Sequence, residues 1–228
     1  MKDIITQVAG LVPLFPLIGF LIISLLNKRL SKDVASMIAC GALFASFVVS
    51  VILFINVPPA GIEVHIADWI NAGTFSASFS FLIDPLSCIF LLIITGVGFL
   101  IHVYSIGYMH DDDNQNIFFS YLNLFIFFML MLVMGSSYLL MFVGWEGVGL
   151  CSYLLIGFWF VNNDYTDAAK KAFIMNRIGD LGFLLALFWL LARIGTVNYA
   201  DVFSAASIAK LSATDITGIT LLLFLGAT

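Results

Sequence analysis

Hydrophobic residues occur along this chain in long runs that short polar segments separate. A helix needs about 20 mostly apolar residues to cross a bilayer. Six runs reach that length, at residues 8–26, 34–55, 85–109, 117–134, 138–161 and 169–193. A further run begins near Ile216 and meets the chain end after about a dozen residues, too few to cross, so we expect the sequence to continue beyond Thr228. The pattern predicts an all-α polytopic membrane protein, with six complete transmembrane helices and the start of a seventh in a single membrane domain over residues 1–228.

The segment 57–83, between the second and third runs, has a different period. Apolar residues alternate with polar ones over residues 62–66 and again over 75–81, which is typical of half-buried strands. Residues 71–74 between them have the composition of a turn. We therefore predict an external β-hairpin here, followed by a helix that Asp84 caps and Pro85 begins.

Residues 199–211 connect the sixth run to the seventh and are too few to span a bilayer. Val202, Phe203 and Ala206 contrast with the polar residues Asp201 and Lys210 in this segment. This amphipathic pattern predicts a helix that lies in the membrane interface.

Composition agrees with a membrane environment and excludes several classes of function. The chain is 62% hydrophobic and 10% charged, whereas soluble domains are about half apolar and a quarter charged. Its net charge of −5 is spread without a basic patch, so nucleic acid is not an expected partner. Cys40, Cys88 and Cys151 lie far apart in apolar runs, and we interpret them as small buried residues. We expect no metal site, haem or nicotinamide motif in this chain.

Basic residues predict the orientation of the chain. Lys28, Arg29 and Lys32 follow the first run, and Lys170 and Lys171 lie between the fifth and sixth. Six alternating spans put both segments on one side, which the positive-inside rule assigns to the cytoplasm. The amino terminus is then expected outside.

Charged side chains within apolar runs are candidates for function, because an ion at the bilayer centre costs roughly 2.5 to 3.5 kcal/mol on insertion scales. The chain has two glutamates: Glu63 lies in the hairpin segment and Glu146 in the fifth run. A carboxylate in such a place can exchange a proton when its hydration and neighbouring charges change. Gly144, Gly147 and Gly149 allow other helices to approach it. We predict that Glu146 relays protons; the alternative is a glutamate that a fixed partner satisfies and that never titrates.

Three other residues in the apolar runs are weaker candidates. Arg177 and Asp180 stand three residues apart on one helical face and can form an ion pair. That pair either tunes proton transfer or only permits insertion into the membrane. His102 lies in the third run, where an imidazole can relay protons or simply hydrogen-bond within the bundle. The predicted order of importance is Glu146, Asp180, Arg177 and His102.

Three stretches carry a family resemblance: WEGVGLCSYLLIGFW at residues 145–159, HVYSIGYM at 102–109, and NRIGD at 176–180. They resemble the proton-pumping, antiporter-like chain 5 (subunit L) of NADH-quinone oxidoreductase, respiratory complex I. The resemblance implies that Glu146 matches the fifth-helix glutamate of the family, which exchanges protons against a lysine in the seventh helix, beyond Thr228. It implies that Asp180 and Arg177 tune this relay and its coupling to the adjacent subunit.

The resemblance also implies a setting for the chain. The expected function is redox-driven proton translocation, and the chain is an enzyme only as a subunit of NADH:quinone oxidoreductase. Flavin, iron–sulfur clusters and quinone are implied in partner subunits, with none in this chain. The expected partners are the other membrane subunits of complex I, especially the adjacent antiporter-like subunit, and the lipid bilayer. The expected location is the cell inner (plasma) membrane, or an organellar inner membrane.

Two alternatives remain open at this point. The large subunit of a multisubunit sodium/proton antiporter shares the Trp-Glu pair at residues 145–146, although its motif usually diverges after the glutamate, where residues 148–151 fit the respiratory chain. The other alternative is a truncated scaffold fragment that conducts nothing.

Overall fold

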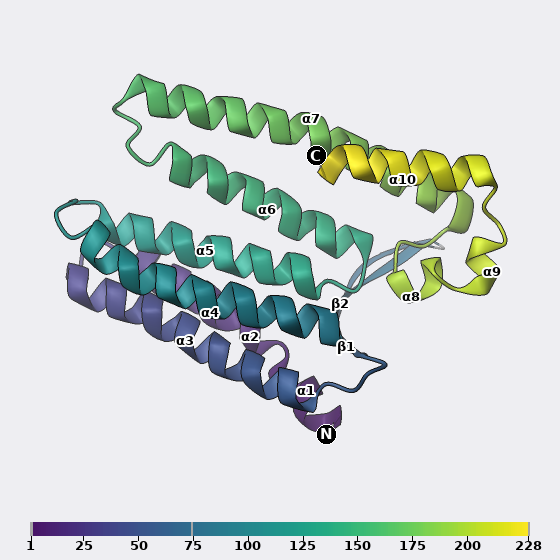
Figure 1. The fold of residues 1–228 in the computed structure, drawn as a ribbon, viewed down its shortest axis with the longest axis horizontal. Coiled ribbons are helices and arrows are strands. Elements are labelled where there is room, and N and C mark those ends of the chain that lie inside the picture. Colours follow the sequence, from purple (N-terminus) through teal and green to yellow (C-terminus); the bar gives the residue numbers. More distant parts are fainter. Residues whose placement is uncertain (1, 74, 228) are drawn as a thin grey trace.

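The computed structural model describes residues 2–73 and 75–227, which form a bundle of long helices with one hairpin (Figure 1). The elements are α1 (Lys2–Val8), α2 (Leu11–Leu25), α3 (Lys32–Asn56), β1 (Ile62–Ala72), β2 (Phe75–Ile83), α4 (Pro85–Tyr108), α5 (Gln115–Met134), α6 (Tyr138–Ile156), α7 (Asn163–Ile194), α8 (Tyr199–Val202), α9 (Ala205–Ile208) and α10 (Ala213–Ala227). Within the described residues, six helical segments are long and apolar enough to cross a membrane, the first being Ile5–Leu25. The predicted fold class is confirmed.

Consecutive long helices run in opposite directions, so their connections gather at two ends of the bundle (Figure 1). One end, which we call the basic end, carries the α2/α3, α4/α5 and α6/α7 connections. Its basic residues are Lys28, Arg29, Lys32, Lys170 and Lys171. The opposite end, which we call the hairpin end, carries the β-hairpin and the short helices α8 and α9.

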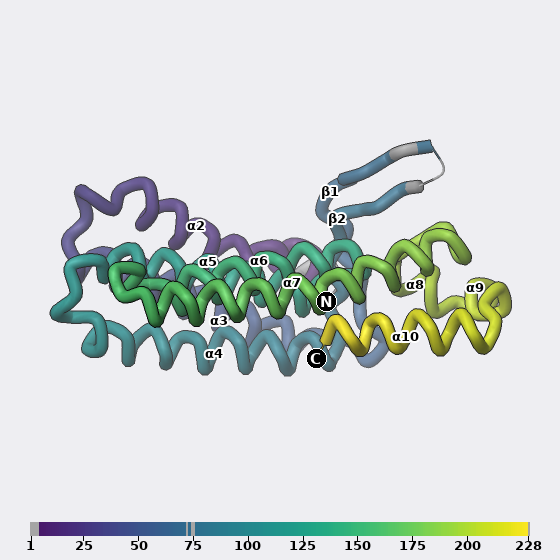
Figure 2. Tube along the Cα trace, turned by 90° about the horizontal axis from the view of Figure 1, so that it is seen from above, coloured from purple at the N-terminus to yellow at the C-terminus, as the bar shows by residue number. Residues whose placement is uncertain are grey.

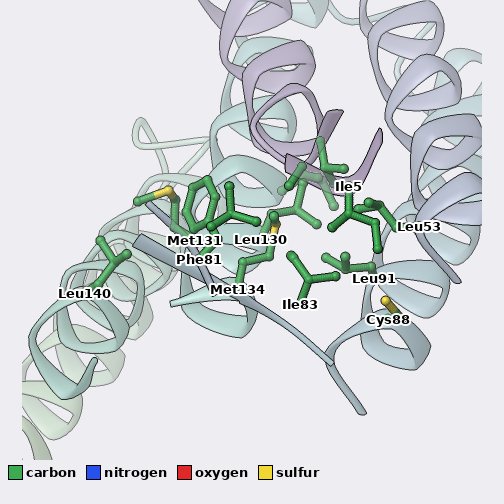
Figure 3. Packing of buried hydrophobic residues seen from close by; sticks show 14 of the residues in the cluster. Ile5, Leu53, Phe81, Ile83, Cys88, Leu91, Leu130, Met131, Met134 and Leu140 are labelled. Atoms are coloured by element: carbon green, nitrogen blue, oxygen red, sulfur yellow. The ribbon is translucent and has the colours of Figure 1, made fainter. Parts of the chain in front are cut away.

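The largest hydrophobic cluster lies at the hairpin end, where α1, α3, α4 and α5 meet the base of the hairpin (Figure 3). Its fully buried members include Ile5, Leu53, Ile83, Leu91 and Leu130. Burying an aliphatic side chain of this size contributes about 1.5 to 3 kcal/mol. The cluster therefore anchors the hairpin to the helices instead of leaving it tethered only by its ends.

The hairpin is antiparallel, with Ile62 opposite Ile83 and Asn71 opposite Ser76. It projects away from the helices (Figure 2). The simple alternation of the sequence is interrupted by register shifts between His65 and Ala67 and again before Ile70. The predicted hairpin is confirmed; its predicted turn at 71–74 includes position 74, which lies outside the described residues.

The segment between α5 and α6 binds both the hairpin and the segment that follows α7. Ser136 N donates to Ser80 O at 3.1 Å, and Tyr138 N donates to Val197 O at 3.0 Å. Ser137 then caps α6, because its side chain accepts a hydrogen bond from Leu140 N at 3.2 Å. These bonds fix the residue at which α6 begins, and therefore how far each residue of α6 lies from the hairpin end of the bundle.

The boundary between the fifth and sixth spans differs from the prediction of 138–161 and 169–193. Helix α6 ends at Ile156 and α7 begins at Asn163. The apolar run continues through Phe158 and Val161, but Gly157 ends the helix and the Asn162 side chain caps the next one by accepting from Asp164 N at 3.0 Å. Glu146 consequently lies near the middle of α6.

The predicted interfacial helix at 199–211 is wrong as a single element. The structure has two short helices, α8 and α9, because Ser204 caps α9 and the backbone at Ser204 is extended. Helix α10 begins at Ala213, three residues before the predicted start near Ile216. The predicted helix cap at Asp84 is confirmed: Asp84 caps α4, and Ser87 N donates a hydrogen bond to its Oδ1 at 2.7 Å.

Candidate functional site

Glu146, Arg177 and Asp180 form one charged cluster between α6 and α7. Arg177 Nη1 makes an ion pair with Glu146 Oε2, and the same nitrogen lies 3.4 Å from Asp180 Oδ2. The exposed fraction is 24% for the Glu146 side chain, 39% for Arg177 and 7% for Asp180. Sequence spacing predicted the pair within α7, but the bridge from Arg177 to Glu146 is a tertiary contact. We call these three residues the Glu146 cluster.

Close packing of α6 on α5 positions Glu146. A Cβ at Gly144 would lie 2.5 Å from Leu132 N, and a Cβ at Gly147 would overlap the Phe128 ring. Only glycine leaves room for this approach. Because Gly144 and Gly147 face α5, Glu146 between them is turned toward α7.

Helix α7 brings a cation and an aromatic ring to the same place. The guanidinium carbon of Arg177 lies 4.5 Å from the ring centroid of Phe173, one turn away. A cation over an aromatic face is attracted by the ring quadrupole. Arg177 therefore has three attractive neighbours: two carboxylates and one ring.

The cluster holds one more negative charge than positive charge when both carboxylates are ionised. Asp180 Oδ1 is buried and has no hydrogen-bond partner among the described residues. Close approach of two carboxylates to one guanidinium favours a state in which a proton or a further cation supplies the missing charge. One proton or one other cation would balance this excess charge.

Stacked aromatic side chains lie on α6 and α7 toward the hairpin end from the cluster. Phe142 stacks on Phe183 with ring centroids 5.4 Å apart, and Trp145 stacks on the same ring at 6.4 Å. Farther toward the hairpin end, Tyr199 donates a hydrogen bond to Met141 Sδ at 3.2 Å. Burial, together with the nearby Tyr138, raises the pKa of Tyr199 above its usual value, so this hydroxyl stays neutral.

Helix α10 packs against α7 beside Asp180. A Cβ at Gly182 would lie 3.1 Å from Leu222 O, and a Cβ at Gly179 would lie 3.3 Å from Gly226 O. A cavity of about 410 Å³ lies between α6, α7 and α10, lined in part by Trp145, Asn176 and Gly226. The residues that line this cavity include sequence neighbours of the cluster, but not Glu146, Arg177 or Asp180 themselves.

His102 is not part of the Glu146 cluster. It lies between α4 and α5, 1% exposed, and its Nδ1 lies 2.8 Å from Gly98 O. Its Nε2 faces the Asn123 amide at 3.5 Å, and Asn123 Nδ2 donates to Phe119 O. Among the described contacts of His102 there is no charged group. The structure therefore separates His102 from the three other predicted site residues.

Sequence reasoning missed a second buried charge, at Asp215 in the first turn of α10. Its Oδ1 accepts from Arg193 Nε at 2.8 Å and from Trp189 Nε1 at 2.9 Å. Its Oδ2 accepts from the Ser212 hydroxyl at 2.7 Å. The spacing of Ser212 and Asp215, a serine followed three residues later by an acid, is a helix-start signal that could have located it.

We expect Ser212→Ala to loosen the first turn of α10. Ser212 Oγ accepts from Asp215 N at 3.1 Å, and loss of such a cap costs about 1 kcal/mol. Local opening should then become roughly fivefold more frequent, which hydrogen–deuterium exchange of the residue 213–217 amides measures. Thr214→Ala, an exposed change in the same turn, is the control. Equal exchange in the two variants would contradict the assignment of Ser212 as a cap.

These features define a class: a polytopic α-helical membrane protein with a partly buried ionic cluster between its helices. The description "NADH-Ubiquinone oxidoreductase (complex I), chain 5 N-terminus" matches residues 69–119, and "NADH:quinone oxidoreductase/Mrp antiporter, TM" matches residues 135–228. NADH-quinone oxidoreductase subunit L of Mycobacterium tuberculosis is 42% identical over 227 residues, which cover 97% of this chain and 35% of the relative. The chain belongs to this family of antiporter-like complex I subunits, chain 5 or subunit L. It spans about a third of the length of that relative.

Solved structures share the fold at lower identity. A chain of an archaeal membrane-bound sulfane sulfur reductase, a respiratory membrane complex, superposes with a TM-score of 0.82 at 18% identity, over 96% of this chain and 44% of that one. A chain of the Mrp complex from Dietzia sp. superposes with a TM-score of 0.78 at 22% identity, over 95% of this chain and 23% of that one. These likenesses concern the fold alone.

Proposed function

We propose that this chain belongs to the proton-translocating membrane arm of an NADH:quinone oxidoreductase and that Glu146 is its proton-carrying residue. The observation that carries the proposal is the Glu146 cluster, in which two carboxylates share one guanidinium between two helices that are long and apolar enough to cross a membrane. A proton on Glu146 cancels the charge that holds it to Arg177. Protonation and movement of the ion pair are therefore linked.

Arg177 acts in this proposal as the movable counter-charge and Asp180 as its alternative partner. When Arg177 pairs with Asp180, Glu146 loses its cation and becomes a better proton acceptor. When Arg177 returns to Glu146, the carboxylate is favoured and the proton is released. His102 stands outside this exchange and has the role of a neutral hydrogen-bonding residue between α4 and α5.

The driving force would come from outside the chain. NADH oxidation and quinone reduction would take place in partner subunits, which would hold the flavin and iron–sulfur clusters. The partners would be the other membrane subunits, with the adjacent antiporter-like subunit as the nearest. The basic end would face the cytoplasm of a cell inner membrane, because Lys28, Arg29, Lys170 and Lys171 gather there.

A second candidate function is sodium/proton antiport without redox coupling. The family description that covers residues 135–228 names both complex I and the Mrp antiporter. The two candidates differ in what drives proton movement: electron transfer in the first, a sodium gradient in the second.

The test uses inverted membrane vesicles that contain the respiratory complex with this chain. Proton uptake is followed with a pH-sensitive dye while NADH is oxidised, in sodium-free buffer and again with sodium. We expect NADH-driven uptake without sodium, and we expect it to depend on Glu146. Proton uptake that requires a sodium gradient and does not depend on NADH oxidation would favour sodium/proton antiport instead.

Asp180→Asn is expected to slow pumping less than a change at Glu146. The amide would keep the size of the side chain but would no longer compete for Arg177, so the ion pair with Glu146 would persist longer. A coupling of about 1 kcal/mol corresponds to a roughly fivefold slower turnover. Proton uptake per electron is the measurement. Loss as complete as for Glu146→Gln would mean that Asp180 is as necessary as Glu146 and that the predicted order of the two residues is wrong.

A further inference from the structure

The Asp215 carboxylate joins α10 to α7 at the hairpin end, and donors occupy both of its oxygens. Oδ1 accepts from Arg193 Nε at 2.8 Å and from Trp189 Nε1 at 2.9 Å, both on α7. Oδ2 accepts from the backbone N of Ser212 at 3.0 Å and from its hydroxyl at 2.7 Å. A carboxylate has about four acceptor positions, so these four donors satisfy it. We call Trp189, Arg193, Ser212 and Asp215 the Asp215 network.

The two charges of this network also suit the helix ends on which they lie. Arg193 is in the last turn of α7, and Asp215 is in the first turn of α10. The helix dipole stabilises a cation at the first place and an anion at the second. In the described part of the chain, Arg193 has one acidic partner, whereas Arg177 lies near two. The Asp215 network is therefore a fixed contact, and the Glu146 cluster offers an exchange of partners.

Arg177 and Arg193 lie on opposite sides of α7. They are 16 residues apart, which corresponds to about 160° around a helix axis. Arg177 pairs with Glu146 on α6, and Arg193 pairs with Asp215 on α10. One ion pair on each side thus holds α7 between its two neighbours, which Figure 1 shows alongside it.

A single antiparallel register continues from the Asp215 network to the level of the Glu146 cluster. One turn beyond Asp215, a Cβ at Gly218 would lie 2.6 Å from Trp189 Cη2. At the far end of the contact, a Cβ at Gly179 would lie 3.3 Å from Gly226 O. Asp215 and Gly226 are about 16 Å apart along the helix axis. The position of Gly226 beside α7 is therefore set by how α10 is held at its start.

The contact near the cluster cannot set this register by itself. Gly179, Gly182 and Gly226 bring the two backbones close together, but they have no side chains that interlock. Apolar side chains such as Ile219 and Leu190 pack between the glycines and the Asp215 network. Among lipid tails, apolar contacts between helices gain little over contacts with lipid, and polar contacts specify the pairing. The Asp215 network supplies the polar contact here.

A shift of α10 along α7 would reach both partners of Arg177. Gly179, which faces Gly226 O, directly precedes Asp180. A Cβ at Gly226 would also lie 3.0 Å from Phe183 Cβ. The Phe183 ring stacks on Trp145, the residue before Glu146. The end of α10 therefore contacts the immediate neighbours of the cluster on α7 and, through one ring, on α6.

We propose that Arg193, Trp189 and Asp215 are positioning residues for proton transfer. They hold α10 in the register in which Gly226 packs on Gly179, and this register keeps Asp180 and Glu146 at the distances between which Arg177 can exchange. The effect on pumping rests on the proposed function of Glu146. The effect on helix register does not, so the two are measured separately.

The network is broken by Asp215→Asn, which keeps the size of the side chain but removes its charge and one acceptor oxygen. Arg193→Met removes the cation and keeps a long stem, and Arg193→Lys restores a cation. We expect the first two variants to lose proton uptake per electron in inverted vesicles, by roughly half or more of the loss that Glu146→Gln causes. Arg193→Lys should retain most of the uptake. Trp189→Phe, which keeps a ring beside Gly218, serves if Asp215→Asn does not assemble.

The register is measured by cross-linking α7 to α10 in the respiratory complex. Ile178 and Ala227 line the same cavity next to the cluster, so cysteines at these positions are treated with a short bifunctional thiol reagent. The three native cysteines are buried. We expect Asp215→Asn to slow this cross-link roughly fivefold or more, although the substitution lies at the opposite end of α10. Uptake is measured in variants without the added cysteines.

Ile219→Ala is the matched control for a purely structural effect. Ile219 is a buried residue of α10, one turn after Asp215 and in the apolar cluster with Leu190. Its truncation leaves a cavity that lowers stability, but the Asp215 network remains. The complex should melt at a lower temperature, while the cross-linking rate and the uptake per electron stay those of the wild type.

Three results would overturn the proposal: an unchanged cross-link in Asp215→Asn, a slower cross-link with normal uptake, or equal losses in Ile219→Ala and Asp215→Asn. Failure of the proposed function gives a different result. If Glu146→Gln pumps normally, Glu146 carries no protons, whatever the cross-link shows. If Glu146→Gln is inactive while Asp215→Asn pumps normally, the function stands and only the positioning role is wrong.

Discussion

Glu146→Gln should nearly abolish NADH-driven proton uptake while the respiratory complex still assembles. Glutamine has the shape of the carboxylate and can accept a hydrogen bond from Arg177, so packing between α6 and α7 is preserved. It cannot take up a proton in the physiological range. A positioned carboxylate typically contributes on the order of 10²- to 10⁴-fold to a proton transfer, so we expect a fall of roughly a hundredfold in transfer through this chain.

The measurement is the number of protons taken up per electron in inverted vesicles, with assembly checked by the amount of intact complex. Glu63→Gln is the matched control, since Glu63 is the other glutamate of the chain and is exposed on the hairpin. It should leave the ratio unchanged. A normal ratio in Glu146→Gln would show that the cluster is only structural.

Gly144→Ala should have the largest effect on stability among single changes near the site. The added Cβ would meet backbone atoms of Leu132, at 2.5 Å from N and 2.6 Å from Cα, and backbone cannot turn away as a side chain can. Helices α5 and α6 must therefore separate. Overpacking of this kind costs typically about 1 to 3 kcal/mol. We expect a lower melting temperature of the purified complex and weaker proton uptake, because Glu146 moves with α6.

Gly41→Ala provides the control for this change. Gly41 lies inside α3, and a Cβ there would meet no described atom within 4 Å. Since alanine is favoured over glycine in helices by about 1 kcal/mol, this variant should be neutral or slightly more stable. If the two variants melt at the same temperature, the close contact between α5 and α6 is not needed for stability.

Hydropathy was sufficient to predict the membrane-spanning helices, because each must bury about 20 apolar residues whatever its neighbours are. The hairpin followed from its alternating pattern, and the cap at Asp84 followed from a local rule that involves only nearby backbone. The ends of α6 and α7 were predicted less well. Phe158 and Val161 are apolar and extended the predicted span. In the structure, Gly157 ends α6 before them and Asn162 caps α7 after them.

The sequence alone also singled out Glu146, since a carboxylate in an apolar run is costly wherever it lies. The sequence did not identify the residue that forms an ion pair with Glu146. Arg177 is 31 positions away in the chain, and only the antiparallel packing of α6 on α7 brings the two together. The same packing aligns Tyr153 with Phe173 and leaves His102 elsewhere, between α4 and α5. Local pattern determined the helices and their anomalous charges; tertiary contacts, which depend on shape at positions such as Gly144 and Gly147, decided which of those charges lie in contact with one another.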